Sequence, residues 1–212
     1  IGYREAMTLP TLPESMVVMG SGAIGIEFAY FYAALGTKVT VVEFLGNILP
    51  REDKDVSKEM EKIFKKKGID VLTSTAVESV DATGKKCVVN IKSADGKTAK
   101  VECDIVLSAV GITTNIEGIG LEEVGVKADK GLVVVDDFYK TNVAGVYAIG
   151  DVASMIKEEL PRGHPMVAPV AIQQGELVAK NIIAQLAGKP QKAFDYFDKG
   201  SMATVGRNKA VM

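Results

Sequence analysis

The chain has 212 residues, 47% of them hydrophobic, which is enough for one or two domains with a sizeable core. Its net charge of −2 excludes a global attraction to nucleic acid or to an anionic membrane. Two cysteines with no redox or zinc spacing predict buried thiols in a reducing cytosol. No signal peptide or transmembrane segment is recognisable. The first residue is not methionine, so we expect part of a longer protein.

The first seventy or so residues predict a parallel α/β core, because short apolar runs alternate with helical patterns. The expected elements are a strand at 15–20, a helix at 22–36, a strand at 37–43, an amphipathic helix at 52–67 and a strand at 69–73. The second helix carries many lysines. They are interleaved with Glu59 and Glu61, which indicates a solvated helix face rather than a nucleic-acid patch.

The next segment predicts an antiparallel insert. Thr83-Gly84 and Asp95-Gly96 are hairpin signals between three alternating runs. We therefore expect a three-stranded meander at 75–81, 86–92 and 97–103, followed by a return to the core as an apolar strand at 104–110. Beyond Gly111 the composition becomes loop-rich, and the elements that we expect there are strands at 132–135 and 146–149, a polar loop at 152–166, a helix at 168–187 and a strand-like stretch at 202–205.

The strongest motif is M-V-V-M-G-S-G-A-I-G at 16–25, followed by V-T-V-V-E at 39–43. A glycine turn between a strand and a helix, with an acid at the end of the next strand, is the dinucleotide-binding fingerprint. The glycines allow a tight turn and close approach of a pyrophosphate, and the helix N-terminus offers N–H groups to the phosphates. The acid would accept hydrogen bonds from a ribose diol and repel a 2′-phosphate. The residues that we expect to hold NAD(H) here are Gly20, Gly22, Ala23, Ile24, Gly25 and Glu43.

Together with L-S-A-V-G at 107–111 and T-N-V-A-G-V-Y-A-I-G-D at 141–151, this fingerprint resembles the pyridine nucleotide-disulfide oxidoreductase superfamily. The resemblance implies that Asp151, after Gly150, binds the ribityl chain of FAD. It implies also that Glu27 lies near the nicotinamide and that Gly111 lets the backbone approach NAD. Ala171 belongs to the helix whose N-terminus would lie under the flavin, and it completes the expected cofactor-binding set. No catalytic residue and no metal ligand can be assigned.

The resemblance defines an α/β fold: a Rossmann-like NAD-binding domain with an antiparallel three-stranded meander, plus the C-terminal part of an FAD-binding domain. We expect an NAD(H)-binding domain at 1–115, a returning segment of the FAD domain at 116–190 and the start of a truncated C-terminal domain at 191–212. The first FAD fingerprint and a C-x-x-x-x-C redox disulfide are absent from the sequence.

Two branches of the superfamily compete. Residues 1–151 resemble dihydrolipoamide dehydrogenase, and residues 163–212 resemble type II NADH:quinone dehydrogenase, so a mosaic chain stays open. In the quinone interpretation, Ala168 and Gln173 contact the substrate, because an amide can donate to a quinone carbonyl. Lipoamide leads on the extent of the match.

The sequence therefore predicts part of an NAD-dependent flavoprotein that transfers a hydride between NAD(H) and FAD, with lipoamide or a quinone as the second substrate. An isolated NAD-binding module without catalysis is the alternative of another class. We expect a cytoplasmic protein, peripheral to the membrane in the quinone interpretation, and a homodimer of the parent enzyme stays open.

Overall fold

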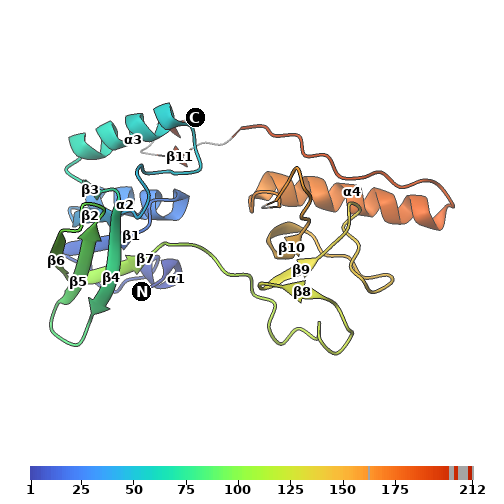
Figure 1. Ribbon diagram of the computed structural model, residues 1–212, viewed down its shortest axis with the longest axis horizontal. Helices are drawn as coiled ribbons and strands as arrows, with labels where there is room; N and C mark the ends of the chain where they lie inside the picture. The colour runs from blue at the N-terminus through green and yellow to red at the C-terminus, as the bar shows by residue number, and fades with distance from the viewer. Residues whose placement is uncertain (162, 201–202, 205–209, 212) are drawn as a thin grey trace. The chain divides into compact units, whose positions relative to one another are not determined.

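The computed structural model describes residues 1–161, 163–200, 203–204 and 210–211 (Figure 1). The chain divides into two compact units. The first comprises Ile1–Ile112 and Gly200–Met212, and the second comprises Thr113–Lys199. The mixed α/β architecture expected from the sequence is confirmed.

The first unit is built on a four-stranded parallel sheet in the order β3-β2-β1-β7. Its elements are α1 (Tyr3–Ala6), β1 (Ser15–Met19), α2 (Ala23–Ala34), β2 (Lys38–Val42), α3 (Lys54–Lys66), β3 (Asp70–Leu72) and β7 (Ile105–Ser108). The predicted strands and helices of this region are confirmed to within their ends, whereas the short helix α1 was not predicted. Strand β1 is central, so β2 and β7 cover both of its edges.

Side chains alternate between the two faces of this sheet. Met16 and Val18 of β1 join the core shared with α2 and α3, whereas Val17 joins a second core with the meander. Both faces are therefore covered. This explains why β1 has a continuous apolar run, Met16–Met19, without the polar alternation of a half-exposed strand.

The meander consists of β4 (Thr75–Asp81), β5 (Cys87–Ser93) and β6 (Thr98–Cys103), paired antiparallel in the order β4-β5-β6. It appears in green in Figure 1. Gly96 has φ of +86°, as the turn between β5 and β6 requires. Val89 and Ile91 of β5 pack with Val17 of β1, which holds the meander on the parallel sheet. The predicted meander is confirmed.

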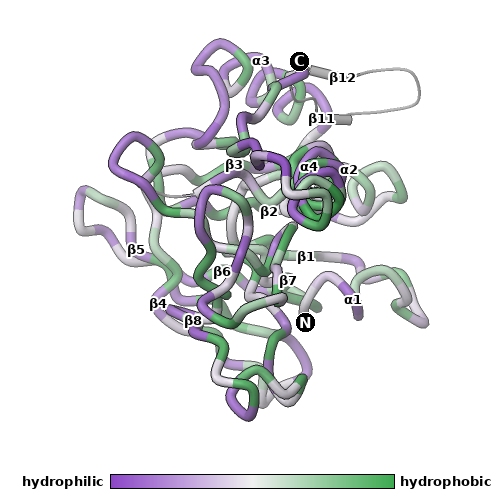
Figure 2. Tube along the Cα trace, turned by 90° about the vertical axis from the view of Figure 1, so that its right-hand side faces the viewer, coloured by the Kyte–Doolittle hydropathy of each residue, from purple (hydrophilic) through white to green (hydrophobic). Residues whose placement is uncertain are grey.

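Helix α3 is amphipathic, and Figure 2 shows polar and apolar stretches mixed along it. The Asp53 carboxylate caps its N-terminus by accepting from the Asp55 N–H at 2.7 Å. Met60 and Phe64 are buried against the sheet. The lysines face solvent; two of them form exposed ion pairs, Lys58–Asp55 and Lys62–Glu59. This arrangement matches the solvated face expected from the interleaved charges.

The second unit contains a small sheet and one long helix. Its elements are β8 (Ala128–Asp129), β9 (Leu132–Val134), a 3-10 helix η1 (Gly150–Val152), β10 (Ala153–Ser154) and α4 (Ala168–Leu186). The sheet order is β10-β9-β8. A core that includes Val133, Tyr139, Met155 and Val178 packs α4 on this sheet.

Two expectations for this unit were wrong. The strand predicted at 146–149 is not formed, because residues 146–148 pair with the nearby stretch 139–141. The Thr141 N–H donates to the Val146 carbonyl at 3.0 Å, and the Ala148 N–H donates to the Tyr139 carbonyl at 3.2 Å. Only an isolated bridge between Lys140 and Tyr147 results. The loop predicted at 152–166 contains β10, because Ala153–Ser154 pairs with β9.

The end of the chain contributes β11 (Ala203–Thr204) and β12 (Ala210–Val211), which pair antiparallel. Of the strand-like stretch predicted at 202–205, positions 202 and 205 lie outside the described residues. Within the described residues, no helix has the length and apolar character needed to span a membrane.

Candidate functional site

The glycine turn lies at the carboxyl edge of the parallel sheet, between β1 and α2. Gly20 has φ of +93°, and a Cβ placed on it would lie 2.6 Å from the carbonyl oxygen of Ala109. A Cβ on Gly25 would lie closer than 3.0 Å to the carbonyl oxygen of Gly20. These two glycines are therefore required by the fold, since they let α2 and the residues after β7 pack directly on the turn.

Gly22 differs from both of them. Its φ is −67° and its ψ is −178°, which any residue can adopt, and a Cβ placed on it would meet no atom within 4 Å. Packing within the chain therefore does not require glycine at this position. A glycine does keep the backbone open to a ligand, because there is no side chain in the way. Gly22 is also the N-cap of α2, and that helix end has no side-chain cap and no acidic residue in its first turn. Ala23 and Ile24 form this first turn. An uncapped helix N-terminus next to an open backbone is suited to bind a phosphate group.

Glu43 follows β2 directly and lies beside the turn. The residue is only 6% exposed. Oε2 accepts from the Ser21 N–H at 2.9 Å and from the Ser21 hydroxyl at 2.5 Å. Oε1 accepts from the Leu45 N–H at 2.8 Å. A carboxylate has about four acceptor positions, so Oε1 keeps capacity for a further donor.

The structure therefore gathers the predicted NAD(H) residues of the first unit at one edge. Gly111 follows β7 at the same edge, with φ of +154°, and is exposed. Glu27 is exposed on α2, one turn after Gly22. Strand order reverses at β1, between β2 and β7, which is where open α/β sheets bind ligands outside the carboxyl ends of their strands.

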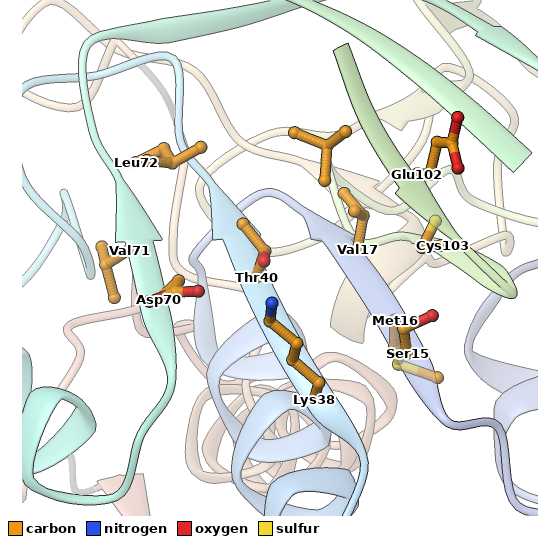
Figure 3. A pocket seen from close by; sticks show the side chains of 11 residues that line it. Ser15, Met16, Val17, Lys38, Thr40, Asp70, Val71, Leu72, Glu102 and Cys103 are labelled. Atoms are coloured by element: carbon orange, nitrogen blue, oxygen red, sulfur yellow. The ribbon is translucent and has the colours of Figure 1, made fainter.

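A hollow of about 340 Å³ lies at the opposite edge of this sheet (Figure 3). Ser15, Lys38 and Asp70 line it from the amino ends of β1, β2 and β3, and Cys103 lines it from β6. Burial raises the pKa of the Cys103 thiol. Because parallel strands bind ligands beyond their carboxyl ends, this hollow is not part of the glycine-turn site. Cys103 is buried, as predicted; Cys87, opposite it on β5, is half-buried, and both are free thiols.

The second unit brings together another group of predicted residues. Gly150 has φ of +70°, and a Cβ on it would lie 3.5 Å from the Cβ of Ala171. Asp151 follows it in η1 and is exposed. Helix α4 begins at Ala168 and has neither a side-chain cap nor an acidic residue in its first turn. An exposed carboxylate and an uncapped helix end therefore occur in this one unit.

A buried network that the sequence did not reveal supports this turn. Gln174 is 3% exposed; its Oε1 accepts from the Gly150 N–H at 2.6 Å and its amide donates to the Tyr139 hydroxyl at 2.6 Å. Burial raises the pKa of Tyr139 to about 12, although the hydrogen bond from Gln174 partly lowers it. Gln174 thereby links α4 to the Gly150–Asp151 turn.

Gln173, the residue assigned to a quinone, is engaged by the chain itself. Its amide donates to the Phe197 carbonyl at 3.0 Å and its Oε1 accepts from the Phe197 N–H at 3.0 Å. Asn181 holds Lys192 in the same two-bond manner, at 2.8 and 2.9 Å. These two amides fix the stretch after α4 along the helix. Ala168 is exposed at the start of α4.

His164 packs against aromatic rings in the second unit. Its ring centroid lies 5.0 Å from that of Phe194 and 6.1 Å from that of Tyr196, both edge-on. Burial, followed by the charge of Lys157, lowers the pKa of His164. Across the part of the chain that the structure describes, no group of three His, Cys, Asp or Glu side chains is arranged to hold a metal ion.

Sequence reasoning missed three contributors to these sites: Ser21, Tyr139 and Gln174. Ser21 occupies a variable position of the glycine motif, so the motif carries no signal for its side chain. Tyr139 and Gln174 are far apart in the chain, and only the packing of α4 brings them together. A buried amide on an apolar helix face is the one sequence feature that could have suggested the network.

The glycine turn, the uncapped helix and the acid after the second strand define a dinucleotide-binding protein of the Rossmann type. The family model described as "Pyridine nucleotide-disulphide oxidoreductase" matches residues 1–175, and the chain belongs to this family.

Similar curated proteins are dihydrolipoyl dehydrogenases. The enzyme of Rhizobium etli is 44% identical over 180 residues, which are 85% of this chain and 36% of that relative. The enzyme of Zymomonas mobilis is 42% identical over 180 residues, which are 85% of this chain and 37% of that relative. The chain thus spans well under half the length of the relatives that it matches.

Solved structures agree on the fold. LpdA from Mycobacterium tuberculosis matches with a TM-score of 0.75 at 29% identity, over 96% of this chain and 41% of that chain. The HOCl-induced flavoprotein disulfide reductase RclA from Escherichia coli matches with a TM-score of 0.73 at 25% identity, over 91% of this chain and 40% of that chain.

Proposed function

We propose that this chain supplies the NAD(H)-binding part, and the returning part of the FAD-binding domain, of a dihydrolipoyl dehydrogenase-like oxidoreductase. The observation that carries the proposal is the combination at Gly22 and Glu43. At Gly22 the space over the backbone is open, although packing within the chain does not require a glycine there. The Glu43 carboxylate, which has an acceptor position left, lies beside the same turn. Pyrophosphate and ribose diol are the two groups that this pair would recognise in NAD(H).

The expected roles follow from position. The N–H groups at the start of α2 would hold the pyrophosphate, and Glu43 would accept from a ribose hydroxyl. Gly111 would let the cofactor lie close to the backbone, and exposed Glu27 would lie toward the nicotinamide. A 2′-phosphate would meet the Glu43 charge, and Phe44 and Leu45 after it offer no cation. The chain should therefore prefer NADH to NADPH.

The second unit fits part of a flavin site. Asp151 would accept from ribityl hydroxyls, with Gly150 and Ala171 allowing close approach, and the N-terminus of α4 would place its partial positive charge toward the flavin. When bound, the flavin would exchange a hydride with NAD(H). This chain's own contribution would be to hold and orient both cofactors.

For the second substrate, the similarity of 44% over 85% of the chain to a dihydrolipoyl dehydrogenase favours the lipoyl group. A quinone is the alternative, and Gln173 would then have to donate to it while releasing or sharing its bond to Phe197. In the complete enzyme, turnover with lipoamide that is unaffected by Gln173→Ala supports the first proposal; turnover with a soluble quinone alone would refute it.

We further propose a cytoplasmic location, supported by two free thiols, and a homodimer of the complete enzyme as the assembly. Size-exclusion chromatography with light scattering tests the assembly.

The binding proposal is tested by fluorescence titration of the chain with NADH and with NADPH. Glu43→Ala should weaken NADH binding by about 1–2 kcal/mol, because it removes a hydrogen bond to a charged group. Glu14→Ala, which removes an exposed acid ahead of β1, is the matched control and should leave binding unchanged. Equal or tighter binding of NADPH by the unaltered chain would overturn the assignment.

A further inference from the structure

Ser21 contacts Glu43, the acceptor that we propose for the ribose, through two hydrogen bonds. Its N–H and its hydroxyl both donate to Oε2 of Glu43, at 2.9 and 2.5 Å. Ser21 is fully buried, so water does not compete for either bond. Its carbonyl in turn accepts from the Leu49 N–H at 3.0 Å, which ties the serine to the chain after β2. The serine therefore stands in a fixed place, and it faces Glu43 rather than the open side of the turn.

Glu43 depends on these donors. Among the described residues, no lysine or arginine pairs with its carboxylate, so three hydrogen bonds balance a nearly buried charge. Two of the three come from Ser21. They occupy Oε2 and leave the remaining capacity on Oε1, which accepts within the described part of the chain from the Leu45 N–H alone.

We propose that Ser21 is a positioning residue that sets the preference for NADH over NADPH by fixing the orientation of the Glu43 carboxylate. This inference rests on the proposed NAD(H)-binding function. In one fixed orientation, Glu43 presents an acceptor to a ribose diol and a full negative charge to a 2′-phosphate. Without the hydroxyl, the carboxylate loses one of its three donors and spends part of its time out of this orientation. The hydrogen bond to the ribose diol would then weaken, and the repulsion of a 2′-phosphate would fall.

The size of the effect follows from rotamer populations. Ser21→Ala removes the hydroxyl donor, while the N–H groups of residues 21 and 45 still reach the Glu43 carboxylate. With one donor fewer, the side chain can sample the other staggered positions, about three at a torsion, at one or both of its aliphatic torsions. The apparent dissociation constant rises in inverse proportion to the fraction in the competent orientation. We therefore expect Ser21→Ala to raise the dissociation constant for NADH by about threefold to tenfold. The constant for NADPH should stay the same or fall.

The experiment is a double-mutant cycle on the full chain, with NADH and NADPH titrated against the unaltered protein, Ser21→Ala, Glu43→Ala and the double variant. If Ser21 acts through Glu43, its substitution has no further effect on NADH binding once Glu43 is alanine. Thr37→Val is the matched control, because it removes another buried hydroxyl, bonded to the Pro13 carbonyl at 2.8 Å at the far end of β2. The control should leave both dissociation constants unchanged.

Thermal unfolding of each variant separates binding from folding. Should Ser21→Ala or Glu43→Ala fail to fold, Ser21→Gly and Glu43→Gln replace them in the same cycle. A fall in the NADH-to-NADPH preference together with a non-additive cycle supports the inference. An equal loss of both cofactors, or full additivity with Glu43→Ala, overturns it while the proposed function holds. If the unaltered chain binds no NADH, the proposed function itself fails, and the inference fails with it.

Discussion

The two glycines at the start of α2 should respond to alanine in opposite ways. Gly25→Ala places a Cβ closer than 3.0 Å to the backbone oxygen of Gly20 and 3.4 Å from the Cβ of Ala109. Neither a backbone oxygen nor a Cβ can rotate away, so α2 must move off β1. Gly22→Ala meets no atom within 4 Å and needs no change of backbone conformation.

The magnitudes separate the two variants. Overpacking of this kind costs about 1–3 kcal/mol, and the gain from replacing a helical glycine by alanine offsets about 1 kcal/mol of it. The movement also loosens the burial of Ile26 and Ala29 on the sheet. With this loss added to the roughly 0–2 kcal/mol that remain after the offset, Gly25→Ala should lower the unfolding free energy of the first unit by about 1–2 kcal/mol. Gly22→Ala should change it by only about 0.5 kcal/mol, but it should weaken NADH binding about tenfold or more, since the new methyl group fills the approach to the backbone.

Urea unfolding followed by circular dichroism measures the first effect, and NADH fluorescence titration measures the second. Gly84→Ala is the matched control, because its Cβ would make an ordinary contact at 3.5 Å in a turn of the meander. If Gly22→Ala binds NADH as tightly as the unaltered chain, the open space at Gly22 is not a cofactor site. If Gly25→Ala is as stable as the control, the close packing of α2 on the turn is refuted.

Further predictions concern the second unit. Gln174→Leu should destabilise it by about 1–3 kcal/mol, because the buried Tyr139 hydroxyl loses its partner and the part-buried Gly150 N–H loses its acceptor, whereas the exposed Gln185→Leu should have little effect in the same urea assay. Because the pKa of Tyr139 is raised from 10.0 to about 12, its contribution to stability is present below pH 10 and is lost as the pH rises through 12; Tyr139→Phe should remove this alkaline loss, and an unchanged profile would contradict it. The purified chain should be colourless or hold FAD weakly, since the flavin site that we propose for it, made of Gly150, Asp151, Ala171 and the start of α4, is part of an FAD-binding domain; stoichiometric flavin absorbance would show a more complete site.

The sequence by itself determined the parallel core, the meander and the position of the glycine turn beside Glu43 at one edge of the sheet. These features depend on short-range signals: apolar runs buried on both faces, hairpin dipeptides, and a glycine turn with Glu43 at the end of the next strand. Each signal lies within a few tens of residues, and the physics that produces it is local. The strand predicted at 146–149 failed for the opposite reason. Apolar character permits a strand, but pairing needs a partner, and this stretch found only its own preceding turn.

Tertiary structure alone decided how the site side chains are held. The glycine motif says nothing about the residue between its first two glycines, yet Ser21 supplies two of the three hydrogen bonds that the described residues donate to the Glu43 carboxylate. Gln174 and Gly150 are likewise separated along the chain, and only the packing of α4 on the small sheet brings their polar atoms together. The periodicity of hydrophobic residues in the sequence indicates which face of a helix or strand is buried. It does not indicate which polar groups form hydrogen bonds after that face packs on another element, because those hydrogen bonds depend on contacts between different helices, strands and turns.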